Sequence, residues 1–139
     1  MRVGPDGGWS VGGSPVRHAA ALRRMKSRLQ FEDGRAFIAD GAERLPVAVE
    51  GPPFEVVSLV LDPVRGDARA RLDDGSEETL VGRELRMSPL TGRFECPARG
   101  GAARAVLSRA AHQALLDHLD EQDGSFFLVV GRSRIPVRT

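Results

Sequence analysis

Asp33–Val47 reads D-G-R-A-F-I-A-D-G-A-E-R-L-P-V, and Asp123–Val137 reads D-G-S-F-F-L-V-V-G-R-S-R-I-P-V. The second stretch lies 90 residues after the first, and the agreement continues backwards into the preceding residues. Between residues 15–47 and 105–137, 11 of the 33 aligned pairs are identical without a gap. Chance gives about 2 to 4 at ordinary residue frequencies. The sequence therefore predicts a structural unit that is used twice.

Each copy is predicted to contain one helix. Ser14 and Pro15 favour a helix start, because the hydroxyl accepts a free backbone N–H and proline loses no hydrogen bond there. The first helix is expected to run on to about Gln30, and the second to span roughly residues 102–120. Both are expected to bury equivalent faces against a common sheet, with these aligned apolar residues inward: Met25 and Leu29 in the first copy, Leu115 and Leu119 in the second.

A hairpin is predicted after each helix. Residues 35–39 and 44–50 form the first, around Asp40-Gly41, and residues 125–130 and 132–137 form the second. Asp-Gly favours such turns because both central residues need positive φ. Pro46 and Pro136 cannot donate a ladder hydrogen bond, so each is expected at a sheet edge or a bulge.

The whole chain is predicted to be α+β, with two repeated β-α-β-β units joined by an antiparallel β-meander and two helices packed on sheet. Residues 1–50 form the first repeat subdomain, 51–92 the linking β-meander and 93–139 the second repeat subdomain. Each copy has about 45 residues, which is too few for independent stability by surface-to-volume scaling. The copies are therefore expected to share one core.

Composition excludes several functional classes. The formal net charge is +1, so no overall field attracts a membrane surface, and nucleic acid is an unlikely partner. The single cysteine, Cys96, cannot form an internal disulfide, which favours a reducing, cytoplasmic setting. The first residues lack an apolar signal core, and residues 126–130 are too short an apolar run to span a bilayer.

Catalysis has little support. Cys96 could pair with His18, His112 or His118 as a small hydrolase or transferase, but a nucleophile needs a base within hydrogen-bond reach and a group to orient it. No such placement follows from the sequence. His112 and His118 diverge around a helix, and one cysteine does not complete a zinc site with them. We therefore expect no enzyme, no metal and no cofactor.

Four residues are the candidates for ligand binding: Trp9, Arg17, Arg44 and Arg134. Arg44 and Arg134 are related by the repeat and could flank a quasi-symmetric cleft for a carboxylate or phosphate. Asp33 and Asp123 are related by the repeat in the same way. The simpler interpretation, which we favour, is an exposed Arg–carboxylate contact within each copy, worth about 0–1 kcal/mol.

The first helix offers a second binding surface, because residues 14–30 hold five Arg or Lys and no acidic residue. It could bind an acidic protein partner, although a solvated face explains the charge more simply. An adaptor that uses the strand edge at Pro46 or Pro136 is a further alternative.

The first half resembles the bacterial domain-of-unknown-function family 1285. The resemblance covers residues 8–61 and rests on the order of these segments: Gly8-Trp9, Gly13-Ser14-Pro15-Val16-Arg17, Leu22 and Leu29, Asp33-Gly34, Phe37-Ile38, Val47-Ala48-Val49-Glu50 and Pro53-Phe54. Residues 39–43 depart from the family's Thr-Pro-x-Glu segment. The resemblance implies an α+β fold with repeated motifs and a role in signal transduction, but no reaction. We accordingly expect a non-enzymatic ligand-sensing or interaction module.

Overall fold

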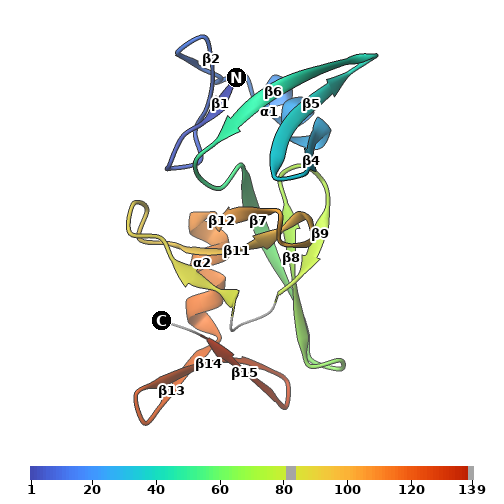
Figure 1. The fold of residues 1–139 in the computed structure, drawn as a ribbon. Coiled ribbons are helices and arrows are strands. Elements are labelled where there is room, and N and C mark those ends of the chain that lie inside the picture. The colour runs from blue at the N-terminus through green and yellow to red at the C-terminus, as the bar shows by residue number, and fades with distance from the viewer. Residues whose placement is uncertain (81–83, 138–139) are drawn as a thin grey trace.

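The chain forms two lobes, which the computed structural model describes for residues 1–80 and 84–137 (Figure 1). The first lobe contains β1–β6 and α1, and the second contains β7–β15 and α2. The structure is α+β, and the residues that it describes form two α-helices and three sheets.

The first lobe is a six-stranded sheet in the order β3-β2-β1-β6-β5-β4. The strand β1 pairs with β6 in parallel, and the other neighbours are antiparallel. The helix lies against β5. The elements are β1 (Arg2–Val3), β2 (Trp9–Val11), β3 (Ser14–Pro15), α1 (Ala19–Arg28), β4 (Leu29–Glu32), β5 (Arg35–Asp40) and β6 (Glu43–Val49).

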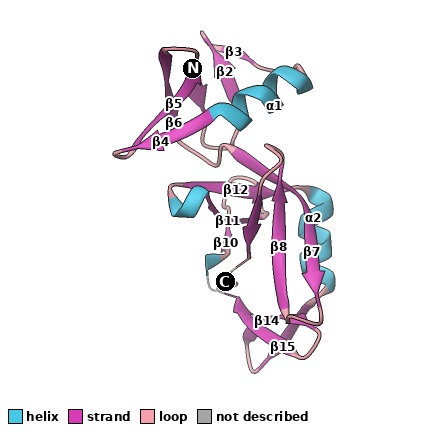
Figure 2. Ribbon diagram, turned by 90° about the vertical axis from the view of Figure 1, so that its right-hand side faces the viewer, coloured by secondary structure: helices cyan, strands magenta, loops and turns pink. Residues whose placement is uncertain are grey.

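The second lobe has a six-stranded sheet in the order β10-β11-β12-β7-β8-β9, with α2 against β7 and β12. A separate three-stranded sheet, β13-β14-β15, lies at the end distant from the first lobe (Figure 2). The elements are β7 (Phe54–Asp62), β8 (Asp67–Leu72), β9 (Glu77–Thr79), β10 (Arg86–Met87), β11 (Phe94–Ala98), β12 (Ala103–Leu107), α2 (Arg109–Asp117), β13 (Leu119–Gln122), β14 (Ser125–Val130) and β15 (Ser133–Val137); a short 3₁₀ turn, η2, covers Arg99–Gly101.

The hairpins that follow the two helices have matching geometry. In the first, Leu29 pairs with Ile38, and in the second Leu119 pairs with Leu128. The turn residue Asp33 has φ 53° and Asp123 has φ 54°, and the glycine after each is also left-handed. Two consecutive positive φ angles give the turn whose twist suits a two-residue hairpin loop.

Both helices are shorter than the sequence predicts. Ser14 and Pro15 form β3, and His18 is the helix N-cap instead, with its Nδ1 accepting the N–H of Ala21 at 3.2 Å. Residues 103–107 form β12 rather than the start of α2, because they pair in parallel with β7 and are largely buried. The last residues of each predicted helix form a strand instead, β4 after α1 and β13 after α2.

The expectation that both helices pack on a common sheet is wrong, since α1 lies on the first sheet and α2 on the second. Leu119 is half-buried in β13, whereas Leu115 on α2 is fully buried. The predicted linking meander does not stand apart, because β7, β8 and β9 are half of the second lobe's sheet. Pro46 lies in β6, and β1 pairs only with Ala48 and Val49 of that strand, so one side of Pro46 has no neighbouring strand residue among those described. Pro136 lies in the edge strand β15.

One cluster of buried residues runs through both lobes. Leu29 and Ile38 belong to it in the first lobe, and Phe54 and Leu115 in the second. The segment between the lobes is tied down by Trp9, whose indole N–H donates to the carbonyl of Pro53 at 2.8 Å. The lobes are therefore joined by apolar packing as well as by the chain.

Candidate functional site

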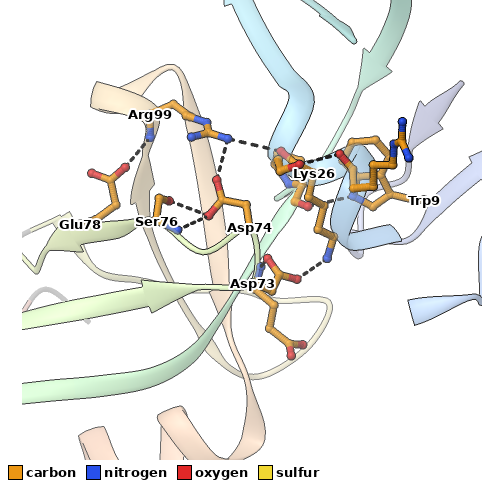
Figure 3. A network of polar contacts seen from close by, with 11 residues as sticks. Trp9, Lys26, Asp73, Asp74, Ser76, Glu78 and Arg99 are labelled. Carbon is orange, nitrogen blue, oxygen red and sulfur yellow. Dashed lines mark hydrogen bonds and ion pairs between the residues drawn. The ribbon is translucent and has the colours of Figure 1, made fainter. Parts of the chain in front are cut away.

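A network of buried charges crosses the boundary between the lobes (Figure 3). Lys26, in the last turn of α1, forms an ion pair with Asp73, which follows β8. The side chains are 9% and 21% exposed. The second oxygen of Asp73 accepts the backbone N–H of Glu55 at 2.9 Å, so the carboxylate is held in place from its own lobe.

Arg99 makes the second connection. Its guanidinium pairs with Asp74 at 2.6 Å and donates to the carbonyl oxygen of Lys26 at 3.3 Å. The same group lies over the ring of Phe54, 4.8 Å from the centroid. Arg99 therefore links α1 to the second lobe through a backbone oxygen, while Lys26 links it through a charge.

Both acidic partners are fixed by further bonds. Asp74 is 2% exposed at its side chain, and its Oδ1 accepts the N–H and hydroxyl of Ser76 at 2.9 and 2.6 Å. The N–H of Arg99 donates to Glu78 at 2.8 Å. Arg99 has φ 52°, which is rare for a residue with a side chain and costs energy that the surrounding bonds must offset. We call Lys26, Asp73, Asp74 and Arg99 the interlobe latch.

A cavity of about 430 Å³ lies against the latch. One wall comes from α1 and the other from β7 and the turn after β8, and Lys26 and Asp73 are both part of the lining. Three apolar side chains and one exposed arginine also line the cavity: Leu22, Val57, Leu72 and Arg23. We call this space the interlobe cavity.

A larger groove of about 960 Å³ runs along the first lobe's sheet. It is lined by Met1, Phe31 and residues 46–49 among others, and among the described residues Ala102 is the one from the second lobe. The latch does not line this groove, so a molecule bound there would not touch the charges that join the lobes.

The four predicted ligand-binding residues do not converge. Arg44 bonds Glu32 at 2.8 Å and lies over Phe37, in the hairpin at one end of the molecule. Arg134 pairs with Asp120 at 3.0 Å in the β13–β15 sheet at the opposite end (Figure 1). The two arginines therefore make local carboxylate contacts, with Glu32 and Asp120 instead of Asp33 and Asp123, and they do not flank one cleft.

Trp9 and Arg17 are also separate from the interlobe cavity. Trp9 is buried, with its indole N–H on Pro53, so it packs the core rather than facing a ligand. Arg17 is exposed on the segment before α1. Within the basic first helix, Lys26 departs from the solvated face expected of it, because Asp73 of the second lobe draws it inward.

The thiol of Cys96 has the properties of a core residue. It is 2% exposed, and burial raises its pKa to about 12, with the nearby charges of Glu78 and Glu95 acting in the same direction against Arg104. A nucleophilic cysteine needs the opposite shift. Among residues 1–80 and 84–137, no group of three potential metal-binding side chains converges.

The sequence holds one signal for the latch. Lys26 is the one lysine among 20 basic residues, the rest being arginine. Asp73 and Asp74 carry no such signal, because their role depends on a helix 47 residues away. Arg99 had no signal, since its left-handed backbone is unusual for any residue but glycine or asparagine.

Comparison with known proteins identifies the fold. No protein-family model matches the sequence, and no curated protein matches it. A DUF1285 family protein from Silicibacter pomeroyi DSS-3 superposes with a TM-score of 0.72 at 23% identity, covering 100% of this chain and 79% of that one. A DUF1285 family protein from Shewanella baltica OS155 has a TM-score of 0.60 at 17% identity, covering 84% of this chain and 89% of that one.

No helix in the described part of the chain is long and apolar enough to cross a membrane. The resemblance predicted from residues 8–61 is confirmed at the level of fold, and it extends over the whole chain. The protein has the fold of these two DUF1285 family proteins.

Proposed function

We propose that this protein is a non-enzymatic sensing module, in which a small organic anion binds in the interlobe cavity and competes with Asp73 for Lys26. One observation carries the proposal: the Lys26–Asp73 pair is both a wall of the cavity and a bond between the lobes. A ligand that occupies the cavity acts directly on the contact that holds the lobes together.

The lining defines the ligand. Leu22, Val57 and Leu72 favour an apolar body, and Arg23 and Lys26 favour an acidic group beside it. The volume of about 430 Å³ lies in the range of small-molecule sites. The best fit is a small organic acid with one apolar portion.

Sensing requires that the ligand distinguishes two states of the protein. An acid bound to Arg23 and Lys26 weakens the ion pair with Asp73, so it binds better to a state in which this pair is broken while α1 and the second lobe still form the cavity. A partner protein that contacts α1 or the β8–β9 turn would then detect the ligand. The assignment to signal transduction rests on the resemblance to the family.

Native mass spectrometry of the purified protein, followed by thermal-shift measurements with the acid found, tests the proposal. Arg23→Gln should weaken ligand binding about tenfold, the loss expected for one charge-assisted hydrogen bond. Arg24→Gln removes the same charge from the neighbouring exposed residue and should leave the affinity unchanged. If no molecule copurifies and no organic acid at millimolar concentration shifts the melting temperature, the proposal fails.

We further propose that residues 19–49 and 109–137 are two copies of one α-β-β-β unit. The bounds of β4 and β13 differ by 90 residues, and so do those of β5 and β14. The strand pairings follow the same offset, and Asp33 and Asp123 share their backbone conformation. The two units differ in their strand neighbours, because β6 pairs with β1 as well as β5, whereas β15 pairs with β14 alone among the described strands.

A second candidate function is that of an adaptor through the edge of β15. In the described part of the chain β15 has one neighbouring strand, β14, whereas β6 has two. An extended peptide from a partner could add to this edge by main-chain hydrogen bonds. Hydrogen exchange of the Arg134 amide, measured with and without a candidate partner, tests the idea: unchanged exchange in a formed complex excludes this edge.

A further inference from the structure

A different cavity, of about 560 Å³, lies where the loop after β1 meets the β10–β11 turn and the first turns of α2. Apart from Leu90, its lining is polar and mostly basic or hydrogen-bonding. The residues that matter to the argument are Asp6, Thr91, Arg93, Arg109, His112 and Gln113. The latch residues do not take part in it.

Two arginines in this lining are free to bind a ligand. Neither guanidinium, of Arg93 or of Arg109, makes a hydrogen bond or ion pair with any residue that the structure describes. Other arginines of the second lobe, such as Arg104 with Glu95 at 3.2 Å, are paired. The one carboxylate of the lining, Asp6, already accepts the N–H of Gly8 at 2.9 Å.

His112 is held in a defined orientation beside these arginines. Its Nδ1 accepts the N–H of Phe94 at 3.4 Å, and its ring lies 5.6 Å from the Phe94 ring, centroid to centroid. An Nδ1 that accepts leaves the proton of the neutral imidazole on Nε2, which is then a donor. Burial lowers the pKa of His112, and the charge of Arg93 lowers it further.

The turn that carries Arg93 is preorganised by its own bonds. The buried hydroxyl of Ser88 accepts the N–H groups of Leu90 and Thr91 at 3.3 Å. The hydroxyl oxygen of Thr91 accepts the N–H of Arg93 at 3.2 Å, which leaves its proton available to a ligand. Gly92 closes the turn at φ 70°. Little order therefore has to be imposed when a ligand binds.

We propose that this cavity binds the phosphoryl group of a small metabolite. Two unpaired guanidinium groups match the charge of a phosphate dianion and can each bond two of its oxygens. The imidazole Nε2–H, the Thr91 hydroxyl and the Gln113 amide can supply donors to the remaining oxygens. A carboxylate, with one charge and two oxygens, would leave part of this set unused.

The site is independent of the interlobe cavity, so either proposal can fail alone. NMR titration of the whole chain with inorganic phosphate, and separately with sulfate, should shift the amide signals of Thr91, Phe94 and His112 in a saturable way. Arg93→Gln and Arg109→Gln should each weaken phosphate binding about tenfold.

The matched control is Arg132→Gln, which removes the same charge from the exposed β14–β15 turn. It should leave phosphate affinity unchanged. Equal weakening in all three variants would show that only net charge matters, and it would overturn the proposal. The absence of saturable shifts with either anion at tens of millimolar would do the same.

The imidazole gives a second readout. Sulfate keeps its charge between about pH 5 and 8, where histidine titrates, so a change in its binding with pH reports on the protein. The charged groups that face His112 in this cavity are Asp6, Arg93 and Arg109. Bound sulfate should raise the pKa of His112, and sulfate should bind more tightly as the pH falls. A His112 pKa that does not move while sulfate binds would contradict the proposed geometry.

Discussion

The ammonium group of Lys26 in α1 is paired with the carboxylate of Asp73 in the other lobe, and both groups are largely removed from water. The two residues lie 47 positions apart in the chain. Their contact, together with the bond from Arg99 to the carbonyl of Lys26, fixes α1 against the second lobe.

Breaking this pair from one side should destabilise the protein. Lys26→Met leaves the Asp73 carboxylate with its bond from Glu55 alone, and an incompletely paired buried group costs about 1–3 kcal/mol, or more if charged. Urea denaturation followed by circular dichroism measures the loss. Arg24→Met, an exposed position on the same helix, should change the free energy of unfolding by less than about 0.5 kcal/mol.

The double variant Lys26→Met with Asp73→Asn extends this prediction. It removes both charges and keeps an oxygen for the Glu55 N–H, so it should lose less stability than the sum of the single variants. A coupling of about 0.5–3 kcal/mol is expected for residues in direct contact. Additive losses would mean that the pair does not hold the lobes together.

Leu115 and Leu119 should differ in their contribution to stability. Leu115→Ala opens a cavity at a fully buried position and should cost about 2–5 kcal/mol. Leu119 is half-buried in β13, so Leu119→Ala should cost about 0.8–1.5 kcal/mol, roughly half the transfer free energy of the side chain. Denaturation midpoints in urea give both values, and a larger loss at Leu119 would contradict the placement of that residue in β13.

Gly34 and Gly124 should respond equally to substitution. They have φ 76° and 81°, and an added Cβ would meet no heavy atom within 4 Å at either position. Alanine there carries only the cost of a left-handed backbone, about 1–2 kcal/mol. Thermal unfolding of the two variants measures it. Asp33→Asn is the control, because asparagine tolerates this conformation; a loss confined to one glycine would argue against two copies of one unit.

Cys96 should be unreactive in the native state and should make stability fall at alkaline pH. Its folded pKa of about 12 lies above the reference value of 9.0. Below about pH 9 the thiol is protonated in both states, and as the pH rises toward 12 only the unfolded state ionises. The free energy of unfolding should then fall by up to about 1.4 kcal/mol per pH unit relative to Cys96→Ala.

Labelling with a thiol reagent checks the same feature. The native protein should react only through unfolding, so the rate should rise steeply when urea is added. Fast labelling at pH 8 without denaturant, or parallel pH profiles for the protein and Cys96→Ala, would show that the thiol is not buried as described.

The sequence alone determined the elements whose cause is local. Asp-Gly favours two consecutive positive φ angles, and residues 33–34 and 123–124 have them. At the predicted Asp40-Gly41 turn only Gly41 has a positive φ, so that prediction is wrong in its turn geometry. The helix starts were less well determined, because residues 103–107 have no local preference that outweighs pairing with β7. The predicted start of the first helix is wrong for a similar reason, since Ser14 and Pro15 pair with β2.

Tertiary structure alone decided which charges came together. Arg44 and Arg134 correspond in the alignment but lie at opposite ends of the molecule, because the two hairpins belong to different sheets. Lys26 and Asp73, which no periodicity relates, meet at the lobe boundary. Local propensity follows from neighbours in the chain, whereas a buried ion pair depends on which surfaces leave water together, and that is a property of the packed chain.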